Sequence, residues 1–242
     1  MKQVVLDLVE NRPLTDQVYR LKLVGDCTAV TRPGQFVNLK LSGLFLRRPI
    51  SVYDATAHSL TLVYKTVGQG TRQLSQMRSG SLDVLTGLGN GYDTSLSTAR
   101  PVLIGGGVGV PPLYLLAKEL IRQGKKPRVI LGFNTASEVF CQKEFEELGI
   151  DVQITTVDGS LGTKGFVTAA MEDCERYVFT CGPEPMLKAV FSHCADGQFS
   201  FEERMGCGFG ACMGCTCRTV TGYKRICKEG PVLKKEEILW NA

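Results

Sequence analysis

The chain has 242 residues, a formal net charge of +4 at pH 7 and 43% hydrophobic residues. This composition is ordinary for a globular protein with a substantial core, and the weak charge without a long basic run argues against nucleic-acid binding. No apolar stretch is long enough to span a membrane, and the mixed, acidic start of the chain is not a signal peptide. Ten cysteines without a secretion signal predict a cytoplasmic protein in a reducing compartment.

The first segment, residues 1–99, is predicted to be an antiparallel β-barrel. Apolar and polar residues alternate over residues 18–24, 35–41 and 60–65, which is the period of a half-buried strand. Turn signals such as Arg32-Pro33-Gly34 separate these runs. Short strands with regular turns predict a barrel or a sandwich.

The second segment, residues 100–198, is predicted to be an α/β domain. Apolar strands alternate with helical patterns, which indicates a parallel sheet covered by helices. The expected strands are 102–104, 128–133, 152–157 and 177–180, and the expected helices are 111–123, 137–148, 166–172 and 184–194.

The third segment, residues 199–242, is predicted to be a small domain that holds a [2Fe–2S] cluster. The first three cysteines follow the plant-type C-x4-C-x2-C spacing, and a fourth lies downstream: Cys207, Cys212, Cys215 and Cys227. Two other interpretations stay open. A four-cysteine zinc site would more often use two C-x2-C pairs, and a disulfide knot would suit a small secreted domain. Cys217 is a further thiol that could replace Cys215 as the third ligand.

Two motifs in the first segment could bind a phosphorylated cofactor. Arg48-Pro49-Ile50-Ser51 follows a β run and offers a cation for phosphate and a hydroxyl for a ring atom. Gly70 and Thr71 open a helical stretch, where free N–H groups and the helix dipole favour a pyrophosphate. A charged surface strand and a plain threonine cap are the competing structural interpretations.

Two further motifs lie in the second segment. Gly105, Gly106, Gly107 and Gly109 connect a strand to a helix, where α/β folds bind phosphates, although the run is not the G-x-G-x-x-G fingerprint. Cys181-Gly182-Pro183 ends the last expected strand, at the edge where such sheets bind ligands. A structural turn and a buried cysteine are the alternatives. Four scattered cysteines are expected to be buried small hydrophobes: Cys27, Cys141, Cys174 and Cys194.

Taken in order, these motifs resemble the ferredoxin reductase superfamily. Arg48–Ser51 is similar to its R-x-x-S flavin motif, Gly70-Thr71 to its second flavin motif, and the glycine run and Cys181-Gly182-Pro183 to its nicotinamide motifs. The order of barrel, nucleotide domain and C-terminal cluster resembles the electron-transfer subunits of class B dihydroorotate dehydrogenases. The end of the chain, from Cys227 to Trp240, is similar to those subunits as well.

The resemblance implies a role for each motif. FAD would contact Arg48, Pro49, Ile50, Ser51, Val63, Tyr64, Lys65, Gly70 and Thr71. NAD would bind at Gly105, Gly106, Gly107, Gly109, Cys181, Gly182 and Pro183, with Cys181 near the site of hydride transfer. The cluster would be held by Cys207, Cys212, Cys215 and Cys227. Asn134 follows the second strand of the nucleotide domain, and the absence of a basic residue there favours NAD over NADP.

The function implied is electron transfer between NAD and a partner subunit in pyrimidine (UMP) biosynthesis. Electrons would run from dihydroorotate through FMN in the partner, then through the cluster and FAD to NAD, so no residue of this chain need act as a catalytic acid or base. The expected assembly is a heterotetramer with two copies of each subunit, without nucleic acid or membrane. The alternatives are the flavin/iron–sulfur subunit of a hydrogenase or of a ferredoxin-linked NAD(P)H oxidoreductase, and a redox sensor that performs no turnover.

Overall fold

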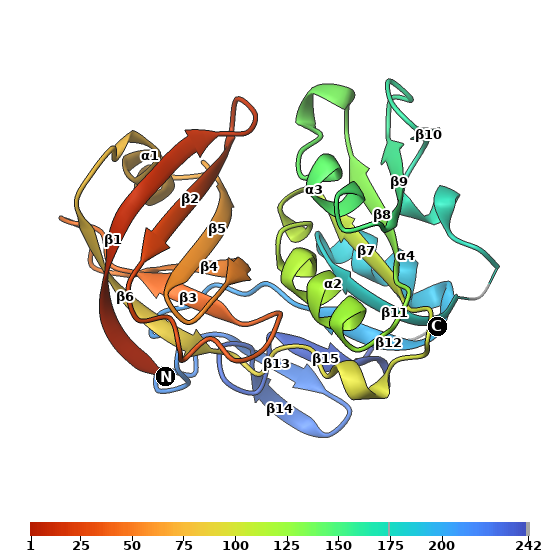
Figure 1. The fold of residues 1–242 in the computed structure, drawn as a ribbon. Helices are drawn as coiled ribbons and strands as arrows, with labels where there is room; N and C mark the ends of the chain where they lie inside the picture. Colours follow the sequence, from red (N-terminus) through yellow and green to blue (C-terminus); the bar gives the residue numbers. More distant parts are fainter. Residues whose placement is uncertain (174, 241–242) are drawn as a thin grey trace.

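The structure is a computed structural model that describes residues 1–173 and 175–240. A β-barrel and an α/β sheet lie side by side, and the C-terminal tail runs along the bottom of both in the view of Figure 1. The predicted fold, with an N-terminal antiparallel barrel, a central parallel-sheet domain and a C-terminal cluster-binding region, is confirmed. Within the described residues, no helix has the length and apolarity needed to cross a bilayer.

The barrel closes through pairing of its first and last strands, in the order β1-β2-β5-β4-β3-β6. Because successive side chains of a strand point to opposite faces, one face of each strand points into the barrel. Leu21 lies opposite Leu62 and Leu23 opposite Leu60, and all four side chains are fully buried. A short helix, α1 (Gln69–Gln76), connects the fifth and sixth strands. The strands are β1 (Lys2–Pro13), β2 (Val18–Val24), β3 (Phe36–Leu39), β4 (Arg48–Ala55), β5 (Ser59–Lys65) and β6 (Ser81–Leu88).

The second sheet has seven strands in the order β10-β9-β8-β7-β11-β12-β15. All neighbours are parallel except β15, which runs antiparallel to β12 and comes from the C-terminal tail. The predicted boundary between residues 198 and 199 therefore falls inside β12, and the tail adds a strand to the same sheet. The strands are β7 (Val102–Gly106), β8 (Arg128–Phe133), β9 (Asp151–Thr156), β10 (Thr163–Lys164), β11 (Glu175–Cys181), β12 (Cys194–Ser200) and β15 (Val232–Lys234).

The helices of this domain are shorter than the sequence pattern predicts. The helix expected over 137–148 is reduced to α3, because Cys141 adopts a left-handed φ of 62° that a continuous helix cannot contain. The helix expected over 166–172 is a single 3-10 turn, bounded by extended Phe166 and Met171. The helices are α2 (Pro112–Arg122), α3 (Gln142–Glu146) and α4 (Glu184–Ser192), with 3-10 turns η1 (Thr94–Leu96), η2 (Gly107–Gly109), η3 (Ala136–Glu138), η4 (Val167–Ala170) and η5 (Lys235–Glu237).

Helix α2 joins the two sheets. Tyr114 on this helix stacks on Tyr53 of the barrel strand β4, with ring centroids 4.4 Å apart and planes inclined by 7°. Lys118, one turn later, forms an ion pair with Asp54 at 2.7 Å. Apolar stacking and a charge pair together fix how the barrel meets the nucleotide domain.

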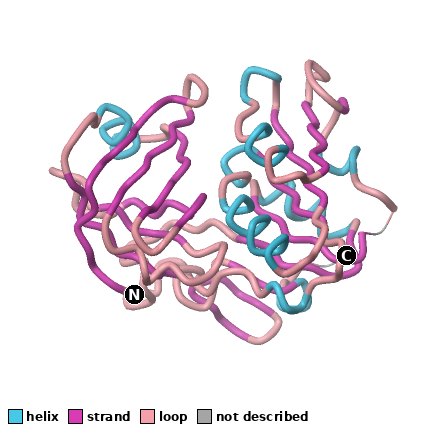
Figure 2. The backbone as a smooth tube through the Cα atoms, in the orientation of Figure 1, coloured by secondary structure: helices cyan, strands magenta, loops and turns pink. Residues whose placement is uncertain are grey.

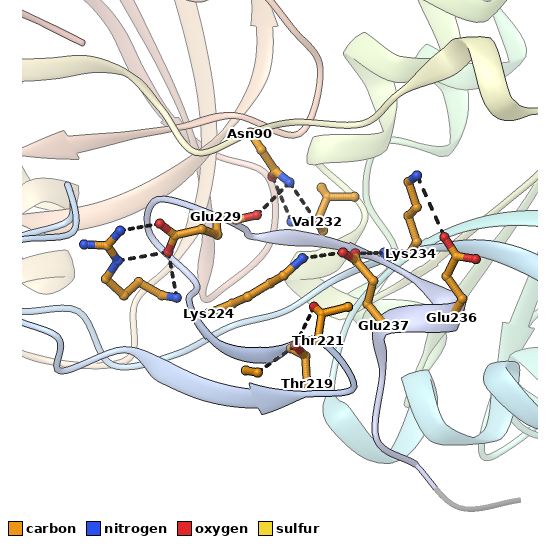
Figure 3. Close-up of polar contacts among 11 residues, drawn as sticks. Asn90, Thr219, Thr221, Lys224, Glu229, Val232, Lys234, Glu236 and Glu237 are labelled. Atoms are coloured by element: carbon orange, nitrogen blue, oxygen red, sulfur yellow. Dashed lines mark hydrogen bonds and ion pairs between the residues drawn. The ribbon is translucent and has the colours of Figure 1, made fainter.

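The tail is mostly loop, with one hairpin formed by β13 (Thr216–Thr219) and β14 (Gly222–Arg225), as Figure 2 shows. It is attached to the rest of the molecule by buried apolar side chains, such as Leu233 and Ile238, and by polar contacts (Figure 3). Asn90, in the segment that leaves the barrel, donates to the carbonyls of Glu229 and Val232 at 3.0 and 2.7 Å and accepts from the Val232 N–H at 3.1 Å. Lys224 on the hairpin forms an ion pair with Glu237.

The scattered cysteines follow the expectation where the structure describes them. Cys27, Cys141 and Cys194 are all buried among apolar residues. Cys174 lies outside the described residues.

Candidate functional site

The cysteine ligands are brought together as two pairs. Cys215 comes directly before β13 and Cys227 follows β14, so closure of the hairpin sets them side by side. The Ile226 N–H donates to the Cys215 carbonyl at 3.0 Å, and the Cys227 N–H donates to Cys215 Sγ at 3.4 Å. In the loop before the hairpin, the side chains of Cys207 and Cys212 interact by a hydrogen bond.

The Cys207 sulfur lies in a nest of backbone donors. The N–H groups of Phe209, Ala211 and Cys212 point at it from 3.5, 3.2 and 3.5 Å. Burial opposes ionisation, but these donors prevail and lower the pKa of Cys207 to about 6. Thiolate is the form that ligates iron, and donors to sulfur are one means by which proteins set a cluster's potential.

The second pair is more deeply buried. Cys215 and Cys227 are each 2% exposed. Burial, followed by the hydrogen bond with Cys215, raises the pKa of Cys227 to about 12. Metal binding would displace the proton of this thiol, because a cysteine ligand binds as the thiolate.

These cysteines fit a cluster with two irons. A [2Fe–2S] cluster takes one pair of thiolates at each iron, which matches the two pairs here. All four ligand cysteines are free thiols, which counts against the disulfide interpretation. Cys217 lies inside β13 opposite Lys224, within the hairpin ladder.

Glycines allow the loop to wrap around the ligands. Gly208 and Gly210 adopt φ values of 80° and 92°, and Met213 adopts 60° between two ligands. Residues other than glycine rarely adopt a positive φ. The backbone conformation of this loop therefore fits the requirements of the site rather than those of a helix or strand.

The two predicted flavin motifs meet at one end of the barrel. A Cβ on Gly70 would lie 2.4 Å from Arg48 Nε, so only glycine lets the guanidinium cross the first turn of α1. Arg47 pairs with Asp83 at 3.0 Å, but Arg48 donates to the backbone carbonyls of Leu46 and Arg47 and has no carboxylate partner in the described chain. A cation beside open helix N–H groups fits a phosphorylated cofactor.

The other predicted flavin residues divide between the two faces of the barrel wall. Pro49 and Ser51 lie opposite Asn38 and Phe36 on the outer face, whereas Ile50 packs on the barrel core. Val63 is buried in the cluster that includes residues of α2, and Lys65 is half-buried at the end of β5.

The hydroxyls of Thr71 and Tyr64 serve the barrel itself. Thr71 Oγ1 accepts the N–H groups of Val67 and Gly68 at 2.9 and 3.2 Å, so Thr71 caps α1 from its third position and the N-cap residue is Gly68 rather than the threonine. Tyr64 donates to Asn11 at 3.0 Å, and its ring lies in the barrel core. Any contact of these two residues with a flavin would therefore come from their backbone.

The two predicted nicotinamide motifs also meet. Cys181 on β11 lies opposite Gly105 on β7. A Cβ on Gly109 would lie 2.2 Å from the Cys181 carbonyl oxygen, and one on Gly106 would lie 3.2 Å from Pro183. The lack of a side chain at these glycines lets the turn after β7 pack against the end of β11. The carboxyl ends of these parallel strands therefore form an edge lined by backbone, which is where such sheets bind ligands.

The Cys181 thiol is not ionised at neutral pH. Burial raises its pKa to about 12, while a hydrogen bond with Ser200 acts in the opposite direction. A neutral thiol at this edge offers a compact apolar contact for a ring rather than a nucleophile.

The end of β8 carries a carboxylate. Asn134 donates from its side chain to Glu138 at 2.8 Å, and its backbone N–H lies 3.3 Å from the same oxygen. A carboxylate at this position can accept from a ribose hydroxyl and repels a 2′-phosphate, so the local charge agrees with the preference inferred from Asn134.

Three residues around the sites were not anticipated from the sequence. Asn38 donates to the Cys207 carbonyl at 3.3 Å, and Arg225 donates to the Gly210 carbonyl at 2.7 Å while it pairs with Glu229. Asn90 anchors the tail. Only Asn90, in Gly89-Asn90-Gly91, has a local signal, that of a turn.

Comparison with known proteins agrees with this geometry. Residues 202–239 match the family described as the iron-sulfur cluster binding domain of dihydroorotate dehydrogenase B, and residues 103–191 match the oxidoreductase NAD-binding domain. The dihydroorotate dehydrogenase B (NAD(+)) electron transfer subunits of Geobacillus sp. (strain WCH70) and Bacillus pumilus (strain SAFR-032) are both 44% identical to the chain. The alignment with the first covers 99% of both chains, and that with the second 98% of both.

A solved structure has the same arrangement of the whole chain. The NADH-dependent reduced ferredoxin-NADP oxidoreductase studied for flavin-based electron bifurcation superposes with a TM-score of 0.87 at 29% identity, covering 98% of this chain and 90% of that one. The family, the fold and the cysteine pairs thus agree over almost the whole length. The chain belongs to the family of dihydroorotate dehydrogenase B electron transfer subunits.

Proposed function

We propose that this chain passes electrons between NAD and an FMN-containing dihydroorotate dehydrogenase catalytic subunit, through FAD and a [2Fe–2S] cluster, in pyrimidine biosynthesis. The observation that carries the proposal is the contact between the cysteine loop and β3, the strand paired with the Arg48–Ser51 motif. It supports the proposal because Asn38, which contacts the loop, shares one face of the barrel wall with Pro49 and Ser51 of that motif, and direct electron transfer requires the two cofactors to lie close together.

The cofactors supply the redox chemistry: the flavin exchanges a hydride with the nicotinamide and single electrons with the cluster. The chain supplies position. Arg48 and Gly70 would hold the flavin phosphates, and Pro49, Ile50, Ser51, Val63, Tyr64, Lys65 and Thr71 complete the proposed flavin set. The glycines of the β7 turn and Cys181–Pro183 would seat NAD against the flavin, since η2 lies beside β5.

NAD is the proposed nucleotide in preference to NADP. Glu138 and Asn134 support this preference, because neither side chain carries a positive charge that could form an ion pair with a 2′-phosphate, and the Glu138 carboxylate would repel it. Glu138→Arg is expected to lower the KM for NADPH relative to NADH by about tenfold, which corresponds to one charge-assisted contact. An unchanged ratio would move the selectivity elsewhere on the nucleotide domain.

The assembly and location are proposed on the same basis. The partner would be the FMN-containing catalytic subunit, in a heterotetramer of two copies of each chain, within the cytoplasm. The three-part division into residues 1–99, 100–198 and 199–242 is kept as a functional division into flavin, nucleotide and cluster regions, although β15 ties the last part to the nucleotide sheet.

The test is an anaerobic visible titration of the purified chain with NADH, followed by addition of the catalytic subunit and dihydroorotate with NAD. We expect flavin and cluster bands that both bleach with NADH. We also expect NAD reduction that needs both subunits. Bands that do not respond to NADH would contradict the relay and favour a redox sensor.

The likeness to the ferredoxin-NADP oxidoreductase supports a second candidate, a subunit of a ferredoxin-linked NAD(P)H oxidoreductase. The same holo protein distinguishes the two. Bleaching by NADH with electron delivery to ferredoxin, and no dihydroorotate-dependent NAD reduction with the catalytic subunit, would favour the second candidate.

A further inference from the structure

One side chain connects the barrel wall to the cysteine loop. Asn38, on β3, is 1% exposed, and its amide nitrogen donates to the Cys207 carbonyl oxygen at 3.3 Å. This bond also defines the orientation of the amide, because the reverse orientation would place two oxygens against each other. A cluster ligand residue is thus hydrogen-bonded directly to a barrel strand.

The backbone of the cysteine loop also packs closely against the Asn38 side chain. Gly208, the residue after this ligand, has a φ of 80°, and a Cβ there would lie 2.4 Å from Asn38 Nδ2. A side chain at position 208 would therefore push the loop away from β3. The loop is seated on Asn38 by both a hydrogen bond and a fit that only glycine allows.

Asn38 also lies on the flavin face. In the β3–β4 ladder it is opposite Pro49, and two residues away Phe36 is opposite Ser51, so these side chains share one face. Val37, between them, points into the barrel core, and Phe36 packs in the cluster of buried residues that contains Cys215 and Cys227. One face of two strands therefore carries Pro49 and Ser51 of the flavin motif together with the seat of the cysteine loop.

The amide oxygen of Asn38 provides an independent observation. It is buried and has no hydrogen-bond partner among the described residues. A buried acceptor without a donor is costly in a folded protein, so this one marks a place where a bound group supplies the donor. FAD carries such donors in its ribityl hydroxyls and ring N–H.

We propose that Asn38 is a positioning residue that holds the cysteine loop on the flavin face and thereby sets the rate of electron transfer between flavin and cluster. Its nitrogen fixes the loop at Cys207, and its oxygen receives a donor of the bound flavin. One electron passes from reduced flavin to oxidised cluster in this step, and Asn38 itself exchanges neither electron nor proton. The inference rests on the flavin site proposed above.

The test is anaerobic stopped-flow reduction of the holo protein by NADH, with flavin and cluster bleaching followed separately. In Asn38→Leu kept saturated with FAD, cluster reduction should slow by about tenfold or more, and by a larger factor than flavin reduction by NADH, since small misplacements of reacting groups have effects of this size. Hydrogen exchange of the residue 207–212 amides in the same holo protein should rise. The FAD dissociation constant should increase by about tenfold.

A second pair of variants covers the case in which Asn38→Leu does not fold. Gly208→Ala pushes on Asn38 from the loop, whereas Gly222→Ala, in the hairpin and with a φ of 111°, would have nothing within 4 Å of its Cβ. Both positions have a positive φ, so the second variant measures backbone strain in the tail without a contact at Asn38. Cluster reduction should slow more in Gly208→Ala than in Gly222→Ala, and equal slowing would contradict the proposal.

The outcomes separate this inference from the proposed function. A native protein whose cluster never bleaches with NADH would contradict the relay itself. A native relay that works, with unchanged cluster reduction and loop exchange in Asn38→Leu, would overturn the role of Asn38 alone.

Discussion

The nicotinamide edge and the cluster loop are built by different means. At the edge, backbone does the positioning: Gly109 packs on the Cys181 carbonyl, and the strands of a regular sheet hold both. In the loop, glycines shape the backbone, but the groups that would hold the cluster are four cysteine side chains, and polar side chains such as Asn90 and Arg225 anchor the tail. An added side chain should therefore disrupt hydride transfer at the nicotinamide edge, whereas removal of a side chain should disrupt cluster binding in the loop.

The largest effect is expected from removal of a ligand. Cys227→Ser should abolish the visible absorbance and the EPR signal of the cluster, because one iron loses a thiolate and a buried hydroxyl replaces it. FAD binding and flavin reduction by NADH should persist, since both depend on the barrel and the nucleotide domain.

Cys217→Ser is the matched control for this change. Cys217 is also part of the hairpin, but the ladder places it opposite Lys224 rather than beside Cys227. The cluster signal should survive this substitution. A loss of signal in Cys217→Ser but not in Cys215→Ser would reassign the third ligand.

An added methyl group should damage the backbone-built site. In Gly109→Ala the Cβ would lie 2.2 Å from the Cys181 carbonyl, and neither backbone segment can move without shifting a strand. We expect about 1–3 kcal/mol of lost stability and about 100-fold slower flavin reduction by NADH. Urea unfolding and stopped-flow reduction measure the two effects.

Gly124→Ala is the control for Gly109→Ala, because it adds a methyl group with backbone strain but without a steric contact. Gly124 has a φ of 77° but nothing within 4 Å of a Cβ, so it should cost about 1 kcal/mol and leave flavin reduction unchanged. Equal kinetics in the two variants would show that the close packing at Gly109 does not shape the site.

The same distinction explains what could be predicted from the sequence. The strands over 102–104, 128–133 and 177–180 were located correctly because each is a mainly apolar run that is largely buried, and the strand over 152–157 was located to within one residue of β9. Residue type and spacing were also enough to propose the cysteine ligands, which stay a prediction, since the chemistry resides in the side chains themselves.

The remainder depends on contacts that are distant in sequence. Strand β12 was missed because its sequence, Cys-Ala-Asp-Gly-Gln-Phe-Ser, has no clear alternation. It is stable in the sheet because the buried Gln198 side chain bonds with the Asp93 backbone and the Tyr177 hydroxyl. Likewise, nothing local in the sequence relates Asn38 to Cys207, which are 169 residues apart.

A smaller effect is expected at the anchor between barrel and tail. Asn90→Ala removes three hydrogen bonds to the backbone of residues 229–232 and should cost about 2 kcal/mol of stability, at roughly 1 kcal/mol or less for each half-buried bond. Hydrogen exchange should rise in the tail before it rises in the sheet. Asn134→Ala, which removes an exposed contact, should change stability by less than about 0.5 kcal/mol. Uniform exchange in Asn90→Ala would show that the tail is held by its apolar contacts instead.

The smallest effect concerns the ion pair between the hairpin and the end of the chain. Burial opposes ionisation of Glu237, but the hydrogen bonds from the Lys224 side chain and the Lys234 N–H, together with the charges of both lysines, outweigh it, and the pKa of this carboxyl lies below its ordinary 4.5. The folded state therefore binds the proton less tightly than the unfolded state, so the pair stabilises the fold above pH 4.5 and this contribution is lost as the pH falls below it. Because both side chains are about one-fifth exposed, the contribution should be less than about 1 kcal/mol. Glu237→Gln should flatten the acid limb of the stability curve, whereas Glu236→Gln, at an exposed carboxyl, should leave it unchanged. Identical acid limbs in all three proteins would mean that the tail is held by Asn90 and the apolar contacts of β15, without help from charge.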